Sequence, residues 1–236
     1  MKTMATDIVC TEPMFIKDTN IILDKLKSYA PWELEGILNT NANIAMKAFM
    51  AFQDFHLTAS KVPAMFAYDG LVYKHLEPLR LSKQAVEYSQ STMRIISAFY
   101  GLLKPLDGIR PYRLEMQSKL RVDGKNLYDF WGDRIYRSLF ENEKCVINLA
   151  SEEYAKIIRK HLKPWDTFID MVFLSDTKGK KRINTTMAKM ARGQMARFIL
   201  ENSIETPELL KAFDGCGFAY EESLSNPNRY VYLTQY

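Results

Sequence analysis

The sequence predicts an α+β fold, in which a mixed sheet is surrounded by helices in one compact domain over residues 1–236. Three observations support this expectation. Helix-like and strand-like patterns of apolar residues alternate along the chain. Apolar residues make up 47% of the 236 residues, which is enough to bury one substantial core. No internal repeat, low-complexity segment or Gly/Ser linker divides the chain, so we expect a single domain.

The first part of the chain is typical of three helices. Asp18 is expected to cap a helix that runs to Tyr29, because Pro31 then stops it and opens a second helix. In residues 43–55 apolar side chains recur at i, i+3 and i+4, the spacing of a helix with one buried stripe. Residues 60–63 break this pattern.

The middle of the chain combines a strand, a helix and a rigid loop. Residues 64–67 are expected to form a short strand, and Ser82 to cap a helix that continues to Tyr100. Prolines and glycines then punctuate residues 101–111, yet the leucines among them need burial. We therefore expect a packed loop there rather than a linker.

The last part of the chain carries most of the strand signal. Residues 126–140 are helical in pattern, residues 146–149 are a short strand, and Ser151 caps another helix.

Two hairpins follow, with a helix between them. Residues 167–174 and 182–185 are expected to pair as a β-hairpin with a basic tip. A helix over residues 186–202 comes next, and residues 218–220 and 229–233 make a closing hairpin.

The positive charge of the chain is concentrated in one segment. The net charge of +4 permits a nucleic-acid partner without requiring one. Residues 178–200 contain seven basic residues and no acidic one, whereas acids dominate residues 201–222. The seven are Lys178, Lys180, Lys181, Arg182, Lys189, Arg192 and Arg197.

Several classes of protein are disfavoured. No stretch approaches the roughly 20 apolar residues of a membrane-spanning helix, and the first residues lack the apolar core of a secretory signal. Cys10, Cys145 and Cys216 are odd in number and far apart, which favours reduced thiols. We therefore expect a cytoplasmic protein without a membrane partner, and the sequence leaves its oligomeric state open.

Common cofactor and metal signatures are absent. The sequence contains no GxGxxG, Walker loop, GxSxG, HExxH or CxxC, and its three histidines lack ligand spacing. We expect no cofactor and no metal site. Any enzyme activity would have to use carboxylates, Tyr, Lys or Arg.

The most unusual motif is YGLLKPLDGIRPYRLEM, which spans residues 100–116. Its prolines fix the backbone and so position the long cations Lys104, Arg110 and Arg113 for contacts with phosphates or carboxylates. Alternatively, Arg113 and Glu115 pair with neighbours and pin a rigid loop. The sequence does not decide between these interpretations.

Two further motifs carry polar groups at helix starts. In NLYDFWGD, Asp129 or Asp133 can act as a base and Tyr128 as a hydrogen-bond donor. In NLASEEY, Asn148 to Ser151 join a strand to a helix N-terminus, a place that suits either an anion or simple capping.

The motif KMARG lies within the basic helix. Lys189, Arg192 and Gly193 share one side of that helix, and Gly193 would allow a ligand backbone to approach closely. A solvated cationic face is the alternative. Clustered Lys and Arg that neutralise phosphates, with Arg197 added, would give salt-sensitive binding of any DNA sequence.

With these motifs in this order, the chain resembles the YaaA family of bacterial peroxide-stress proteins. The resemblance runs from about residue 2 to residue 233 and also includes KMARGQMARFILEN. It implies a compact α+β fold, DNA binding through a basic cleft with a helix-hairpin-helix-like element near residues 93–103, and a role in limiting damage when peroxide meets intracellular iron.

The resemblance also implies an N-terminal strand, which we expect this chain to lack. Family members open with a short apolar strand, whereas this chain starts at Met1-Lys2-Thr3-Met4. We expect the sheet position of that strand to be unfilled.

Two hypotheses about function follow from the sequence. The first is a DNA-binding stress protein, whose phosphate-facing candidates are Lys104, Arg110, Arg113, Lys189, Arg192 and Arg197. The alternative is an enzyme that acts on a nucleic acid or an anionic small molecule. In it, Glu115 or Asp129 serves as acid or base, Tyr128 as donor and Arg113 as charge stabiliser.

Overall fold

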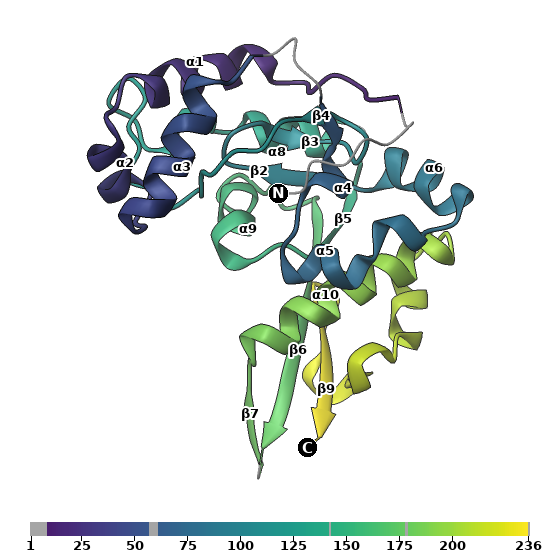
Figure 1. Cartoon of the computed structure of the whole chain (residues 1–236). Coiled ribbons are helices and arrows are strands. Elements are labelled where there is room, and N and C mark those ends of the chain that lie inside the picture. Colours follow the sequence, from purple (N-terminus) through teal and green to yellow (C-terminus); the bar gives the residue numbers. More distant parts are fainter. Residues whose placement is uncertain (1–8, 57–60, 142, 178, 236) are drawn as a thin grey trace. The chain divides into compact units, whose positions relative to one another are not determined.

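The computed structural model describes residues 9–56, 61–141, 143–177 and 179–235 and confirms the α+β fold class (Figure 1). The chain forms two compact units. Unit 1 takes the described residues of segments 1–67, 93–141 and 151–162, and unit 2 those of 68–92, 142–150 and 163–236. The single domain therefore stays a prediction, and the expected loss of an N-terminal strand lies outside the described residues.

Three helices open unit 1, as predicted. They are α1 (Ile16–Lys27), α2 (Pro31–Ile37) and α3 (Ala42–Gln53). The expected cap of the first helix is wrong, because Phe15 occupies the N-cap and Asp18 lies in the first turn. In that turn the Asp18 carboxylate still interacts favourably with the positive end of the helix dipole.

A short helix replaces the strand expected at residues 64–67. The segment is α4 (Ala64–Ala67), and all four of its side chains are buried. The strand β1 (Val62–Pro63) precedes it and pairs with β4 (Gly108–Ile109). A buried apolar run of four residues fits either a strand or a helix, so the sequence pattern does not distinguish the two.

The helix expected from Ser82 to Tyr100 ends early. α6 (Lys83–Thr92) closes a segment of unit 2, and the chain then forms the antiparallel hairpin of β2 (Ile95–Ser97) and β3 (Gly101–Leu103) in unit 1. The Ser97 hydroxyl accepts from the backbone N–H groups of Phe99 and Tyr100 at 3.2 and 2.9 Å, which holds the turn. A β-hairpin therefore stands at residues 93–103, where the resemblance implied a helix-hairpin-helix-like element.

The helix expected over residues 126–140 is two helices. α7 (Leu127–Trp131) and α8 (Arg134–Phe140) are separated at Gly132, whose φ is +55°. α9 (Glu152–Arg159) follows within unit 1. Trp131 is fully buried and its indole N–H donates to the Ala98 carbonyl at 3.0 Å, which ties α7 to the β2–β3 turn.

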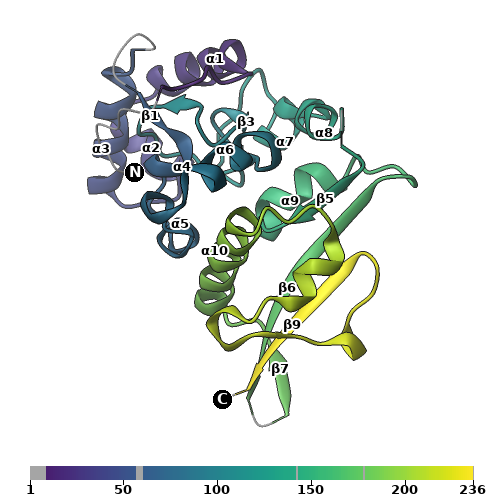
Figure 2. The same cartoon turned by 90° about the vertical axis from the view of Figure 1, so that its right-hand side faces the viewer.

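Unit 2 is built on the sheet that carries the strands predicted for the last part of the chain (Figure 2). Its order is β5 (Cys145–Asn148), β6 (Thr167–Thr177), β9 (Arg229–Gln235) and β8 (Ala219–Tyr220). β6 runs parallel to both β5 and β9, and β8 is antiparallel to β9. The predicted closing hairpin is confirmed. The hairpin with a basic tip is also present, but it pairs Ser175–Thr177 at the end of β6 with β7 (Lys180–Arg182), and not residues 167–174 with 182–185 as expected.

One long helix covers one face of this sheet. α10 (Thr185–Glu201) packs Ala188, Ala191 and Met195 into a core that includes Phe173 and Tyr232 of the sheet. The remaining elements of unit 2 are α5 (Leu71–Leu76) and the short 3-10 helices η1 (Pro78–Arg80), η2 (Pro207–Ala212), η3 (Gly215–Gly217) and η4 (Glu222–Leu224).

Gly193 brings α5 against α10. A Cβ atom on Gly193 would lie 2.2 Å from the Val72 carbonyl oxygen and 2.8 Å from the Cβ of His75. The expectation that this glycine admits a ligand backbone is therefore wrong, because the backbone of α5 already occupies the space.

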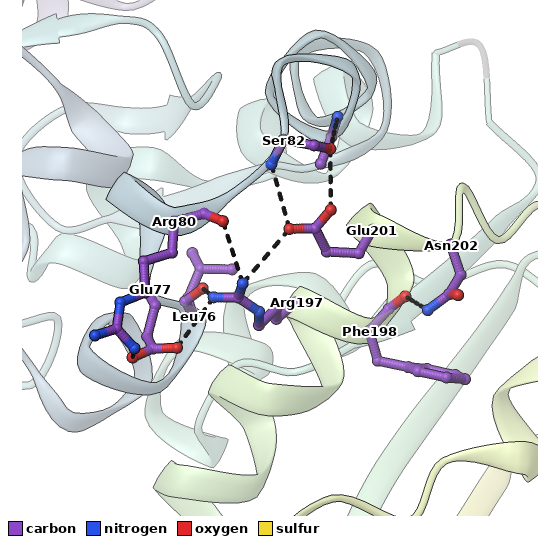
Figure 3. Close-up of polar contacts among 9 residues, drawn as sticks. Leu76, Glu77, Arg80, Ser82, Arg197, Phe198, Glu201 and Asn202 are labelled. Atoms are coloured by element: carbon purple, nitrogen blue, oxygen red, sulfur yellow. Dashed lines mark hydrogen bonds and ion pairs between the residues drawn. The ribbon is translucent and has the colours of Figure 1, made fainter.

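Arg197 joins α10 to the turn that follows α5 (Figure 3). Its guanidinium donates to the carbonyls of Leu76 and Arg80 at 3.4 and 3.2 Å and pairs with Glu77 at 3.1 Å. Glu201 extends this cluster, since it accepts from the N–H and hydroxyl of Ser82 at 3.3 and 2.9 Å. The cluster fixes α5, η1 and the start of α6 on one side of α10.

Replacing Arg197 with methionine should destabilise unit 2 by about 2 kcal/mol, because it leaves two carbonyls and the Glu77 carboxylate without their donor. Urea unfolding measures this loss. Lys189→Met on the same helix is the control, since the Lys189 side chain is exposed, and its change should stay within about 0.5 kcal/mol. Equal stability of the two variants would contradict a clamping role for Arg197.

Candidate functional site

Unit 2 presents exposed cations at the β6–β7 hairpin and the start of α10. We call Lys180, Lys181, Arg182 and Lys189 the cationic edge. All three residues of β7 are exposed, and so is Lys189. β7 is an edge strand, since within the described residues it pairs with β6 alone, through Ser175↔Arg182, Asp176↔Lys181 and Thr177↔Lys180.

The start of α10 adds to the positive field. Asn184 caps the helix, and its side-chain oxygen accepts from the N–H groups of Thr186 and Met187 at 3.1 and 3.2 Å. The first turn contains no acidic residue, so nothing in it offsets the positive end of the helix dipole.

Most of the cationic edge lacks an internal counter-ion. Among the described residues, Lys180, Arg182 and Lys189 make no ion pair. Lys181 lies near Glu221, whose pKa is lowered first by hydrogen bonds from Ser223 and then by this lysine. The edge is therefore available to an anionic partner, although lysines on an edge strand also deter pairing between sheets.

Arg192 differs from the exposed cations of the same helix. It is half-buried, and its Nε is buried without a hydrogen-bond partner among the described residues. Burial lowers the pKa of its guanidinium, while the nearby Asp170 carboxylate opposes that change. Lys189 and Arg192, predicted to act together, thus have different surroundings, and Arg197 has its donors committed to α5 and η1.

Asn148 and Asp170 form a polar pair across β5 and β6. They are register partners, and the Asn148 amide donates to the Asp170 carboxylate at 2.7 Å. The Asn148 side-chain oxygen accepts from the N–H of Ala150 at 3.0 Å. The motif NLASEEY therefore starts with a fixed carboxamide at the end of β5.

Arg110 has a structural position in unit 1. Its guanidinium donates to the carbonyls of Asp54 and His56 at 3.0 and 3.2 Å and lies over the Phe55 ring at 5.3 Å. Only 19% of its side chain is exposed. Arg110 therefore holds the chain that follows α3.

Lys104 lies between β3 and β4, two short strands that the structure has in the segment expected to be a packed loop. Its side chain is exposed, and its backbone N–H donates to the Asp107 carboxylate at 2.8 Å. Asp107 is buried and also accepts from the Thr11 hydroxyl at 2.6 Å. Burial raises the pKa of Asp107, and these hydrogen bonds oppose the rise.

Arg113 and Glu115 pair with each other at 3.0 Å on the surface of unit 1. This is the pairing that the sequence left open. Both side chains are about half exposed, so solvent screens the pair and its contribution to stability is small.

Tyr128 contacts α9, and Asp129 contacts Lys160, the C-cap of that helix. The Tyr128 hydroxyl donates to the Glu153 carbonyl at 2.9 Å, and Asp129 lies 3.6 Å from the Lys160 ammonium. Asp133, the other base candidate, pairs with Arg137 at 2.7 Å, and hydrogen bonding from Arg137 lowers its pKa.

Tyr154 is a half-buried polar residue of α9 that the sequence analysis did not single out. Burial raises the pKa of its phenol, and Tyr112, Glu153 and Glu115 lie near enough to raise it further. The Tyr154 phenol therefore stays protonated at neutral pH. In the sequence, the only signal that Tyr154 lies near these residues was the presence of acidic and aromatic residues in the neighbouring motifs.

Neither a metal site nor a membrane-spanning helix is found in the described part of the chain. No group of three or more His, Cys, Asp or Glu side chains there is arranged to hold a metal ion. None of the helices found there has the length and apolar character needed to cross a membrane.

Comparison with known proteins agrees with the motifs. A family model described as "Peroxide stress protein YaaA" matches residues 1–224. A UPF0246 protein of Agathobacter rectalis is 42% identical over 221 residues, covering 93% of this chain and 89% of the relative. A UPF0246 protein of Lactiplantibacillus plantarum is 39% identical over 227 residues, covering 96% and 92%. One of Lachnoclostridium phytofermentans is 42% identical over 227 residues, covering 95% and 89%.

Proposed function

The chain belongs to the YaaA peroxide stress protein family, and from this premise we propose that it binds DNA, single-stranded or duplex, through the cationic edge of unit 2. One observation carries the proposal: Lys180, Arg182 and Lys189 are exposed and have no internal ion pair among the described residues. Cations in this state can neutralise phosphates without first breaking an internal contact. Such contacts position a protein on DNA of any sequence.

The other predicted phosphate-facing residues divide into two groups. Lys104 and Arg113 are exposed and can add contacts from unit 1. To bind a phosphate, Arg110 and Arg197 would have to leave the internal carbonyls to which they donate. Arg192 is half-buried. We therefore assign none of these three residues to the first contact with DNA.

We propose that this binding takes place in the cytoplasm. Its role there would be in the response to peroxide stress, after which the family is named. Cys10, Cys145 and Cys216 are free, which suits a reducing compartment. Coverage of DNA would limit its exposure to the oxidants that peroxide forms with iron. The enzymatic alternative through Glu115, Asp129, Tyr128 and Arg113 stays a prediction.

Fluorescence anisotropy with labelled single-stranded and duplex DNA tests the proposal across a salt series. The triple variant Lys180→Glu, Arg182→Glu and Lys189→Glu should bind about 100-fold more weakly at low salt. Its slope of log affinity against log salt should be smaller by about 2 to 3, because each lost phosphate contact removes about 0.9.

A charge-matched control separates the cationic edge from net charge. Lys17→Glu, Lys119→Glu and Lys163→Glu change the same total charge at exposed positions elsewhere on the two units. This control should keep most of the affinity and salt slope. Equal losses in both triple variants would show that bulk charge, and not the cationic edge, determines binding.

A further inference from the structure

An exposed isoleucine lies within the cationic edge. Ile183 follows Arg182 of β7 and precedes Asn184, the N-cap of α10. Its side chain is 60% exposed, although isoleucine is among the residues most often buried in folded proteins. Every residue from Lys180 to Thr186 is exposed as well. Ile183 therefore faces solvent in the middle of an exposed, mainly cationic segment.

Fixed elements hold Ile183 on both sides. Before it, Arg182 pairs with Ser175 in the ladder of β6 and β7. After it, the Asn184 side chain caps α10 by accepting from the backbone N–H groups of the first turn. Because Ile183 stands between a paired strand and a capped helix, its backbone is positioned before any partner arrives. Binding through this residue therefore requires little further ordering of the chain.

The surroundings of Ile183 distinguish it from another exposed aliphatic residue of unit 2. Leu209 of η2 is 54% exposed, but its neighbours in the sequence include the exposed acids Glu205 and Glu208. Ile183 instead follows the three cations of β7, and the first turn of α10 after it contains no acid. A single exposed apolar residue needs no explanation by itself. One that stands among cations is placed against the anion that those cations bind.

The chemistry of DNA restricts what an aliphatic side chain can contact there. Phosphates and sugars are polar, and the faces of the bases are covered by stacking in a duplex. An isoleucine reaches a base face by entering a base step, which partly unstacks that step and kinks the duplex by about 20 to 90°. The bend brings further phosphates toward the protein, and these contacts offset the cost of deforming the DNA.

We propose that Ile183 inserts into a base step of duplex DNA held at the cationic edge and so bends the duplex. The inference rests on the proposed function, because the cations must first hold the phosphates. It deepens that function by separating two roles within one surface. Lys180, Arg182 and Lys189 supply affinity for any sequence, and Ile183 supplies the deformation of the DNA.

Energy transfer between dyes on the two ends of a duplex tests the bend. A duplex of about 20 base pairs is about 70 Å long, and a kink brings its ends closer. Saturating wild-type protein should raise the transfer, and 2-aminopurine placed within the duplex should brighten because its step is unstacked. With Ile183→Ala at saturation, neither signal should change. Bending without brightening, or equal signals from the two proteins, would overturn the proposal.

Two control variants and one altered duplex define the role of the side chain. Leu209→Ala should bend DNA as the wild type does, and Ile183→Leu should retain the bend because its side chain still inserts. Ile183→Ala should keep the wild-type melting temperature, since the side chain is exposed. Uracil in place of thymine removes the apolar methyl groups of the major groove and should leave the bend unchanged. A bend that required thymine would replace insertion by methyl contact.

The salt dependence separates this inference from the proposed contact with phosphates. Ile183→Ala should keep the wild-type slope of log affinity against log salt, because it removes no phosphate contact. If the cationic-edge triple variant loses DNA while Ile183→Ala still bends it, the inference fails alone. If the triple variant binds normally and bending still depends on Ile183, the role of the cations fails alone. Absence of DNA binding by the wild type would overturn both.

Discussion

Replacing Gly193 with alanine should prevent α5 from packing on α10 and so destabilise unit 2 severely. The new Cβ would lie 2.2 Å from the Val72 carbonyl oxygen, 2.8 Å from the Cβ of His75 and 3.0 Å from the Leu76 nitrogen. Two of these contacts involve backbone atoms, which cannot rotate away as a side chain can. The helices would have to separate.

The expected loss is large on the scale of a single substitution. Overpacking costs about 1 to 3 kcal/mol where side chains can adjust. Here a helix backbone must move, so we expect at least about 3 kcal/mol, a large share of the 5 to 15 kcal/mol that stabilises a typical domain. Urea unfolding followed by circular dichroism measures this loss.

Gly36→Ala provides the matched control. Gly36 also lies within a helix, α2, and a Cβ there would meet nothing within 4 Å. Alanine is the better helix former, so this variant should gain up to about 1 kcal/mol. If Gly193→Ala were as stable as Gly36→Ala, the close contact between α5 and α10 would not exist in solution.

Replacing Gly101 with alanine should cause the second large loss, this time in unit 1. Gly101 has φ of +75°, and a Cβ would lie 2.8 Å from the Trp131 ring and 2.9 Å from the Phe15 ring. Neither ring can easily move, because Trp131 is fully buried, donates to Ala98 and packs edge-on against Phe15. Left-handed backbone costs about 1 to 2 kcal/mol and overpacking a similar amount, so we expect about 3 kcal/mol in total.

Gly124→Ala separates these two contributions. Gly124 has nearly the same φ, +74°, but a Cβ there would meet nothing within 4 Å. Its variant should therefore lose only the backbone contribution of about 1 to 2 kcal/mol. Thermal unfolding of both variants gives the difference, and no difference between them would exclude close packing of Trp131 against Gly101.

The sequence was sufficient where a pattern extends over many residues. The stripe of residues 43–55 predicted α3, and the strand patterns on both sides of the basic tip predicted a β6–β7 hairpin, although not its exact pairing. Prediction from the sequence pattern failed at short apolar runs. Ala64–Ala67 is buried on all sides, so neither a period of two nor one of 3.6 is visible in it. Ile95 and Ile96 end the helix near Thr92 because β-branched residues pair well in a hairpin.

The residues of the candidate site show a different limit of prediction from sequence. The exposed cations of residues 180–189 could be found from sequence because a run without acids is visible by eye. The role of Gly193 could not, since it depends on a helix more than a hundred residues earlier. That the Arg192 Nε has no partner among the described residues likewise depends on the folded structure. Residue types at a given spacing do not reveal which donors remain unsatisfied.

The order of strands in unit 2 has a consequence for translation. Among the described strands, β9 is synthesised after the others, yet it lies between β6 and β8 in the finished sheet. The last segment of unit 1 ends at Leu162, so that unit can fold on the ribosome while unit 2 is still incomplete. Until Arg229 to Gln235 emerge, β6 lacks a neighbour along one edge. At this stage the nascent chain exposes an unpaired strand edge, and such edges favour pairing with other chains.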